Sequence, residues 1–220
     1  MDATSTDKIA YLTFDDGPNE PYTSQILEIL EQFGARATFF VCGKNVRKYP
    51  GLAARIAAGG HALGNHSFSH LLWETLLGDV TTGIAQTQQL INPFNASKLY
   101  RSPWGITPPW AKKKLQEAGY TIVPWNIMAF DWYQPKPEFI ADHIVSRIFP
   151  GAIILLHDGE KTNTVSRAAT AAALPLLLQR LTDQGYQCKE LTKTVVKPKN
   201  IPMYFFTDLF LGLRYFLGTM

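Results

Sequence analysis

Short segments rich in β-branched and aromatic residues alternate with segments of helical periodicity along most of this sequence. Residues 8–14 are typical of a strand, and residues 24–33 place apolar side chains on one helical face before Gly34. Repeated strand–helix units form a largely parallel sheet covered by helices. About seven such units follow one another, which favours a closed or nearly closed barrel over a flat nucleotide-binding sheet.

The later units have recognisable ends, because glycine or proline follows most of the periodic segments. We expect further strands at residues 37–42, 61–66, 98–101, 120–125, 152–157 and 186–192, and further helices near residues 45–58, 79–91, 108–118, 138–148 and 165–183. Residues 1–194 are therefore assigned to one α/β domain. The sequence contains neither GxGxxG nor GxxxxGKS or GxxxxGKT, the glycine-rich phosphate-binding loops of nucleotide-binding folds.

Residues 195–220 form a segment of different character at the end of the chain. Phenylalanine and leucine side chains recur there at helical spacing, interrupted by Asp208 and Arg214. The segment is too short and too charged to cross a bilayer. We expect a C-terminal amphipathic helical tail that packs on the domain, with a contact to another copy or to a membrane surface through residues 203–220 as the alternatives.

Composition excludes several classes of protein. The chain has 220 residues, 46% of them hydrophobic, and 21 lysines and arginines stand against 18 aspartates and glutamates. The resulting net charge of +3 is too small and too dispersed for a nucleic-acid partner, and no apolar run reaches the roughly 18 residues of a transmembrane helix. Cys42 and Cys188 are too few for a four-cysteine zinc site or a disulfide scaffold.

The amino terminus lacks the basic segment, the apolar core and the small-residue cleavage site of a secretory signal. The sequence as written therefore predicts a cytoplasmic protein. If a leader that belongs before Met1 is missing from it, the protein is instead expected to be extracytoplasmic or membrane-associated.

Polar and ionisable side chains collect where the predicted strands end. The carboxyl ends of parallel strands, with the loops that follow them, form the active face of such a fold. Each cluster alone has an ordinary structural explanation, such as a turn or a strand-end histidine, and that explanation is kept for His61 and His143. Together they predict one site. The five clusters, in chain order, are Asp15–Asp16, His66 with His70, Arg101, Asp131 with Trp132, and His157–Asp158.

His66 and His70 are four residues apart, so on a helical turn both imidazoles would face the same way and could share a metal ion. Asp15 or Asp16 could complete a ligand set of two histidines and one carboxylate. Ser67 stands where an HExxH metalloprotease has its glutamate, so the general base must come from elsewhere. The aspartate that does not bind the metal is suited to take a proton from metal-bound water.

The segments TFDDGP, HSFSH, RSPWG, DW and LLHD resemble, in order and approximate spacing, the five motifs of the polysaccharide deacetylases, also called carbohydrate esterase family 4 or the NodB-homology domain. The resemblance covers residues 8–192. It implies a distorted (β/α)7 barrel and a metal-dependent hydrolase that removes N-acetyl groups from glycans containing N-acetylglucosamine. Chitooligosaccharide, peptidoglycan and a related glycoconjugate are the candidate substrates.

The resemblance also implies a role for each matching residue. One divalent metal ion would be held by Asp16, His66 and His70. This ion is most often Zn²⁺ in the family, and Co²⁺, Ni²⁺ or Mn²⁺ suit the same mixture of nitrogen and oxygen ligands. Asp15 would be the general base, and Arg101 would orient it and balance its charge.

On the other side of the reacting group, His157 would be the general acid, and Asp131 would support it. The backbone N–H of Trp104 would help the metal to stabilise the oxyanion. The family commonly has tyrosine at this position, so the tryptophan bears on substrate preference. The full set of substrate-binding residues that the resemblance implies is Pro103, Trp104, Trp132 and Leu155.

Two other functions fit the same residues. The barrel could hydrolyse another linear amide or an O-acetyl ester, because the same attack by water serves every acyl carbon. A catalytically silent carbohydrate-binding protein is the second alternative, and it predicts that a ligand, the base or the acid is lost. The enzyme is favoured because all of these are present, namely Asp15, Asp16, His66, His70 and His157.

Overall fold

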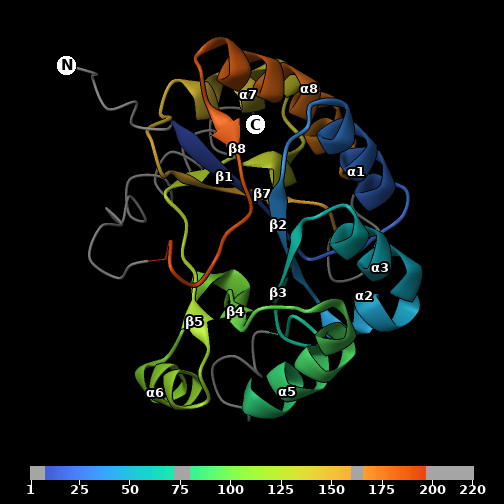
Figure 1. Ribbon diagram of the computed structural model, residues 1–220, viewed down its shortest axis with the longest axis vertical. Helices are drawn as coiled ribbons and strands as arrows, with labels where there is room; N and C mark the ends of the chain where they lie inside the picture. The colour runs from blue at the N-terminus through green and yellow to red at the C-terminus, as the bar shows by residue number, and fades with distance from the viewer. Residues whose placement is uncertain (1–7, 72–79, 160–165, 197–220) are drawn as a thin grey trace, which may run out of the picture.

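The structure is a computed structural model that describes residues 8–71, 80–159 and 166–196. Its centre is a curved sheet of parallel strands with helices on the outside (Figure 1). Among the described residues, seven strands follow the order β5-β4-β3-β2-β1-β7-β6, and β8 pairs with the start of β1. The strands are β1 (Ile9–Asp15), β2 (Ala37–Val41), β3 (Ala62–Asn65), β4 (Leu99–Tyr100), β5 (Thr121–Ile122), β6 (Ile127–Met128), β7 (Ile153–His157) and β8 (Gln187–Cys188).

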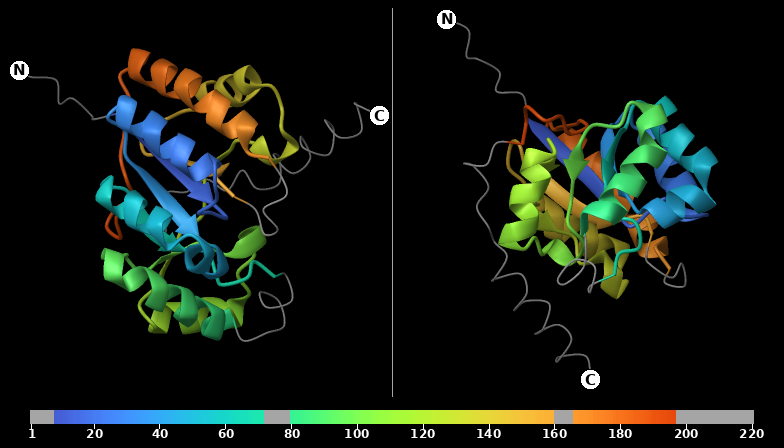
Figure 2. Two further views of the ribbon diagram at one scale, coloured as in Figure 1. Left: turned by 90° about the vertical axis from the view of Figure 1, so that its right-hand side faces the viewer. Right: turned by 90° about the horizontal axis from the view of Figure 1, so that it is seen from below.

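Helices connect the successive strands, except β5 and β6, and lie on the outer face of the sheet (Figure 2). They are α1 (Tyr22–Gln32), α2 (Gly43–Lys48), α3 (Pro50–Ala58), α5 (Val80–Ile91), α6 (Pro109–Glu117), α7 (Pro137–Val145) and α8 (Ala168–Asp183), with the short 3-10 turns η1 (Asn92–Phe94), η2 (Pro103–Gly105) and η3 (Asp131–Tyr133). Within the described strands no pairing joins β5 to β6, the two ends of the order. The predicted distorted (β/α)7 barrel is confirmed, and it is not fully closed.

Alternate residues of the central strands face two different cores. Leu12 of β1 packs with apolar residues of the helices in the cluster that lies between sheet and helices. Tyr11 belongs to a second cluster, formed by residues of the strands and of the chain after β8. Because side chains alternate along a strand, Thr13 and Asp15 lie on the same interior face as Tyr11. The register of β1 with β7 sets Asp15 beside His157, so neighbouring strand ends bring these two groups together.

Several element boundaries differ from the prediction. The helix expected at residues 45–58 is two helices, because Pro50 starts α3 directly after Tyr49 ends α2. The sequence does not predict β6, which pairs with β7, and β5 is only two residues long within the expected strand 120–125. These short strands are fixed by pairing with a longer neighbour and not by a periodic pattern of their own.

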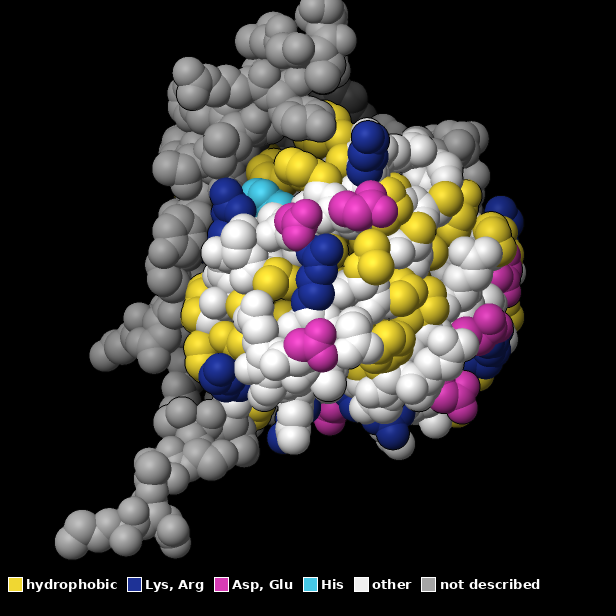
Figure 3. All heavy atoms as spheres, turned by 90° about the horizontal axis from the view of Figure 1, so that it is seen from above, with side chains coloured by type: hydrophobic (Ala, Val, Ile, Leu, Met, Phe, Trp, Pro, Cys, Tyr) yellow, Lys and Arg dark blue, Asp and Glu magenta, His cyan; other side chains and the backbone are white. Residues whose placement is uncertain are grey.

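The expected C-terminal tail lies outside the described residues, apart from Val195 and Val196. Val196 is buried in the interior cluster, so the described chain stays attached to the domain up to that residue. None of the described helices combines the length and the apolar character that a membrane span requires. On the face over α7 and α8, acidic, basic and apolar side chains are interspersed (Figure 3), in agreement with the dispersed charge of the sequence.

Candidate active site

The carboxyl end of β1 carries two aspartates. Asp15 is the last residue of the strand and is buried, and Asp16 follows it in the left-handed region with φ +76°. A left-handed residue breaks the alternation of the strand, so consecutive side chains need not point to opposite faces. Both carboxylates reach the same histidine: Asp15 Oδ2 lies 3.8 Å and Asp16 Oδ1 lies 3.3 Å from His66 Nε2.

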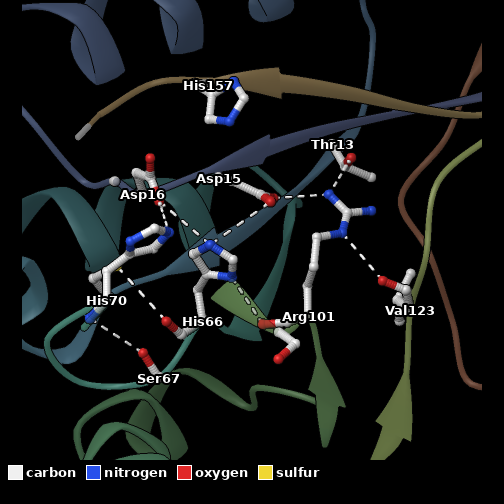
Figure 4. Close-up of polar contacts among 12 residues, drawn as sticks. Thr13, Asp15, Asp16, His66, Ser67, His70, Arg101, Val123 and His157 are labelled. Carbon is white, nitrogen blue, oxygen red and sulfur yellow. Dashed lines mark hydrogen bonds and ion pairs between the residues drawn. The ribbon is translucent and has the colours of Figure 1, made fainter. Parts of the chain in front are cut away.

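The loop after β3 carries His66 and His70. The expectation that they share a helical turn is wrong, because residues 66–71 form an irregular loop in which Ser67 and His70 have φ of +65° and +58°. Asn65 turns this loop by accepting a hydrogen bond from the Ser67 backbone N–H at 3.0 Å. The two imidazoles still converge, with ring centroids 5.1 Å apart, and Figure 4 shows both directed at Asp16.

Asp16, His66 and His70 form a set that fits a divalent metal ion. Asp16 Oδ1 lies 3.3 Å from His66 Nε2 and 3.2 Å from His70 Nε2, and the three candidate ligand atoms lie within 4.8 Å of one another. Asp16 Oδ1 is buried and accepts no hydrogen bond, an arrangement that a cation between the three groups would satisfy. His66 Nδ1 is bonded to the Arg101 carbonyl at 2.8 Å, which leaves Nε2 as the nitrogen facing the site.

The electrostatics favour the forms of Asp16 and His70 that bind metals. Burial alone would raise the pKa of Asp16, but the facing imidazoles of His66 and His70 outweigh it, and the pKa lies well below its ordinary value. Burial lowers the pKa of His70 to about 4 in spite of the nearby Asp16 carboxylate. At neutral pH the site therefore offers a carboxylate oxygen and a neutral imidazole nitrogen.

Asp15 has a different partner from Asp16. Its Oδ1 accepts a hydrogen bond from Arg101 Nη1 at 2.8 Å (Figure 4), and both side chains are almost fully buried. Arg101 follows β4 and also donates to Thr13 Oγ1 at 2.7 Å and to the Val123 carbonyl at 3.2 Å. The Arg101 guanidinium lies over the Phe40 ring. Arg101 is thus fixed by several contacts and balances the charge of the carboxylate that lies next to the candidate metal ligands.

Replacing Arg101 by methionine is expected to lower the free energy of unfolding by about 3–5 kcal/mol, because Asp15 would remain buried without its counter-charge. Urea denaturation in the presence of a chelator measures this loss without a contribution from bound metal. The matched control is Arg55→Met, which breaks an exposed ion pair with Glu28 and should cost at most about 1 kcal/mol. Equal losses in the two variants would contradict the assigned role of the Arg101–Asp15 pair.

A second pair, the partly buried His157 with the fully buried Asp131, lies at the end of β7. His157 Nδ1 is 2.8 Å from Asp131 Oδ1, and Asp131 Oδ2 accepts hydrogen bonds from the His157 backbone N–H at 2.7 Å and from Thr170 Oγ1 at 2.8 Å. Burial alone would lower the pKa of His157, but the Asp131 carboxylate outweighs it and the pKa is raised. In Figure 4, Asp15 and Asp16 lie between His157 and the pair His66 and His70.

Two indole rings flank these groups. Trp104, in η2, has its ring centroid 5.2 Å from that of His70, and its side chain is 49% exposed. Its backbone lies in the left-handed region, with φ +62°. Trp132, in η3, meets the His157 ring edge to face at 5.4 Å. One wall of the site is therefore aromatic beside the candidate metal ligands, and the other is aromatic beside His157.

Four other residues were considered in the sequence analysis, two as part of the site and two as structural histidines. Leu155 is buried two residues before His157 and hence on the same face of β7, and Pro103 is buried at the start of η2. His61 accepts a hydrogen bond from the Ala37 backbone N–H at 3.2 Å, and His143 packs between phenylalanine rings. Both of these histidines have the structural settings expected for them.

Three residues that support the site have no role that the sequence alone predicts. Thr170 in the first turn of α8 bonds Asp131, Asn45 in α2 bonds the Asp16 carbonyl, and Asp158 bonds the Gly17 backbone N–H. Asp158 belongs to the LLHD segment, so the sequence motif already places it at the site. No sequence pattern marks Asn45 or Thr170, because a single side chain that forms a hydrogen bond to a distant group has no periodicity.

Comparisons with known proteins agree with this geometry. The sequence model of the family described as polysaccharide deacetylase matches residues 2–123. A peptidoglycan-N-acetylglucosamine deacetylase of Bacillus cereus is 36% identical over 190 residues, which cover 83% of this chain and 86% of that protein. A chitooligosaccharide deacetylase of Sinorhizobium fredii is 35% identical over 191 residues, with coverage of 82% and 89%. The crystal structure of the polysaccharide deacetylase Bc1974 from Bacillus cereus superposes with a TM-score of 0.77 and 32% identity, covering 91% of this chain and 98% of that chain.

Proposed function

We propose that this chain, which belongs to the polysaccharide deacetylase family, is a metal-dependent hydrolase that removes N-acetyl groups from N-acetylglucosamine units of a glycan. One observation carries the proposal. A single centre, built where β1, β3, β4, β6 and β7 end, holds a metal-ligand set, a carboxylate paired with arginine and a histidine paired with aspartate. The relatives named for peptidoglycan and chitooligosaccharide deacetylation support N-acetylglucosamine as the substrate unit.

Asp16, His66 and His70 are proposed to hold the divalent cation, for which Zn²⁺ is the first candidate and Co²⁺, Ni²⁺ and Mn²⁺ suit the same ligands. A divalent cation at this position supplies Lewis acidity toward an acyl oxygen and lowers the pKa of a water ligand. The unpartnered Asp16 Oδ1 between two imidazoles supports this assignment.

Asp15 is proposed to be the general base. Its Oδ1 is occupied by Arg101, whereas its Oδ2 faces the metal-ligand cluster, 3.8 Å from His66 Nε2. Oδ2 is therefore the atom that would take the proton from the attacking water. Arg101 keeps the carboxylate in the orientation in which that oxygen faces the reacting centre.

His157 is proposed to be the general acid. Its Nδ1 is engaged by Asp131, so Nε2 is the atom that would pass a proton to the departing amine. Thr170 and the His157 backbone N–H occupy the second oxygen of Asp131, which fixes the carboxylate behind the imidazole. Base and acid thus stand at the ends of neighbouring strands, as the transfer of a proton to each side of the substrate requires.

The rings of Trp104 and Trp132 are proposed to bind the faces of sugar residues on either side of the centre, because flat apolar rings suit the CH-rich faces of pyranosides. Leu155 and Pro103 would line the groove and the pocket for the acetyl methyl group. The Trp104 backbone N–H would donate to the oxyanion.

A panel of acyl substrates tests the proposed function. Acetate release from chitooligosaccharides and from peptidoglycan fragments is compared with release from an O-acetylated glycan and from an N-acetylated linear amide that contains no sugar. Release mainly from the N-acetylglucosamine substrates supports the proposal. Release mainly from the ester or the sugar-free amide would replace it by a different deacylase on the same barrel, and binding without release would indicate a carbohydrate-binding protein.

Replacing Asp131 by asparagine is expected to move the alkaline limb of the pH profile to lower pH. The Asp131 carboxylate keeps the pKa of His157 raised, so an acid that must be protonated stays active to higher pH in the wild type. Without that charge the pKa falls, and activity is lost earlier as pH rises. The measurement is kcat/KM against pH at saturating metal. The control is Asp142→Asn on the exposed side of α7, and an alkaline limb that stays in place in Asp131→Asn would contradict the assignment of the acid.

A further inference from the structure

We propose that Asn45 and Asp158 are positioning residues that hold the peptide group between Asp16 and Gly17 and thereby set the affinity of the site for its divalent cation. The inference rests on the proposed function only in that Asp16 is taken as a metal ligand. Neither residue contributes a ligand atom, and both act on the backbone of the residue that does.

The backbone of Asp16 has an unfavourable conformation that its surroundings must maintain. With φ +76°, this residue lies in the left-handed region of the backbone angles, which residues other than glycine rarely adopt. Such conformations persist where neighbouring groups fix them, and they concentrate at functional sites. Since the direction of the Asp16 carboxylate follows from its backbone, whatever fixes this conformation also fixes Oδ1 between His66 and His70.

Asn45 holds the carbonyl side of the peptide group. Its Nδ2 donates to the Asp16 carbonyl oxygen at 2.6 Å, and its side chain is buried at the start of α2. The next carbonyl of the loop, that of Gly17, accepts a hydrogen bond from the Cys42 backbone N–H at 2.9 Å. The junction of β2 and α2 therefore binds two successive carbonyls of the loop that follows β1.

Asp158 holds the amide side of the same peptide group. Its Oδ1 accepts a hydrogen bond from the Gly17 backbone N–H at 3.1 Å, and its Oδ2 accepts one from Thr23 Oγ1 at 2.7 Å. Asp158 has no exposed surface. A Cβ on Gly17 would lie 2.1 Å from Asp158 Oδ2, so only glycine permits this close approach.

These contacts act together because the Asp16 carbonyl and the Gly17 N–H belong to one planar unit. Asn45 comes from α2 and Asp158 from the end of β7, so the peptide plane is held from two elements at its two polar atoms. Rotation of the plane would break one bond or the other and would turn the Asp16 carboxylate away from the histidines. Removal of either partner should therefore weaken metal binding before it affects the rest of the fold.

Titration of the metal-free protein with Zn²⁺ against a competing chelator tests the inference. In Asn45→Ala the affinity for Zn²⁺ is expected to fall about 10- to 100-fold, the range typical for partners that orient metal ligands. The matched control is Asn126→Ala. Asn126 is another buried asparagine, and its Oδ1 accepts a hydrogen bond from the Ile153 backbone N–H at 2.8 Å. This control should lower the melting temperature similarly and leave the affinity for Zn²⁺ unchanged.

Two variants of Asp158 provide an independent arm. Asp158→Ala removes the acceptor for the Gly17 N–H and should lower the affinity in the same range, whereas Asp158→Asn retains an oxygen at that position and should preserve most of it. This rescue separates the orienting contact from general damage to the fold. If Asp158→Ala does not fold, the comparison of Asn45→Ala with Asn126→Ala decides the question alone.

The outcomes for the inference and for the proposed function are distinct. Wild-type affinity in folded Asn45→Ala, or an equal loss in Asn126→Ala, would overturn the inference while the proposed function stands. A wild-type protein that binds Zn²⁺ but releases no acetate would overturn the proposed function, and the affinity comparison would still decide the inference. A wild-type protein that binds no divalent cation would overturn both.

Discussion

The His66→Ala variant is expected to lose its bound divalent cation and to release acetate no faster than chelated wild-type protein. His66 Nε2 faces Asp16 Oδ1 at 3.3 Å, and its Nδ1 is fixed by the Arg101 carbonyl. Loss of this imidazole leaves one histidine and one carboxylate, too few ligands for a tightly held catalytic ion. The metal content of the purified protein and the initial rate of acetate release from a chitooligosaccharide measure the two effects.

His61→Ala is the matched control for this prediction. His61 is also a buried histidine, but it lies before the start of β3, bonded to the Ala37 backbone N–H, and not at the carboxyl end. Its replacement should lower stability while the metal content and the rate stay near those of the wild type. A His66→Ala protein that retains one equivalent of metal and its activity would show that the metal ligands are misassigned.

The Asp15→Asn variant is expected to keep its metal and to lose activity. The substitution preserves the shape of the side chain but removes the charge and the capacity of Oδ2 to take a proton. General base catalysis typically contributes about 10²- to 10⁴-fold, so kcat should fall by that factor. The assignment depends on the two aspartates having different partners, with Asp15 on Arg101 and Asp16 between the histidines.

Asp16→Asn is the informative comparison for Asp15→Asn, because the same substitution at the neighbouring residue should lower the metal content as well as the rate. Both variants are purified in the same way, and the metal content, the melting temperature and kcat are measured for each. If Asp15→Asn lost the metal and Asp16→Asn kept it, the roles of the two aspartates would be reversed. An Asp15→Asn rate within tenfold of the wild type would remove Asp15 from the reaction.

The sequence predicts the location of this site well, because two simple rules act together. Alternation of strands and helices implies a parallel sheet, and parallel strands place the residues that follow them on one face. The residues at the carboxyl ends of β1, β3, β4 and β7 accordingly meet in one cluster. The same rules do not choose between Asp15 and Asp16 as metal ligand on spacing alone. In the structure Arg101 pairs with Asp15, whereas both histidines lie close to Asp16 Oδ1, and the proposed roles of the two aspartates rest on this difference.

Local backbone geometry is where the prediction fails. The four-residue spacing of His66 and His70 suggests a helical turn, yet the residues converge through left-handed conformations at Ser67 and His70. Glycine is the usual sequence signal for such conformations, and neither position has it. Asp16 and Trp104 share this property. Tertiary contacts, such as those of Asn45 with the Asp16 carbonyl, maintain these conformations, and contacts of this kind are not readable from a single sequence.

The most direct test of the central claim is acetate release from N-acetylglucosamine oligomers by the metal-loaded protein, before and after chelation and with Asp15→Asn measured beside it. The proposed mechanism predicts release that chelation abolishes, that added Zn²⁺ restores, and that Asp15→Asn lacks although it binds one equivalent of metal. Acetate release that continues unchanged after complete removal of the metal, or equal release by Asp15→Asn and the wild type, would contradict it.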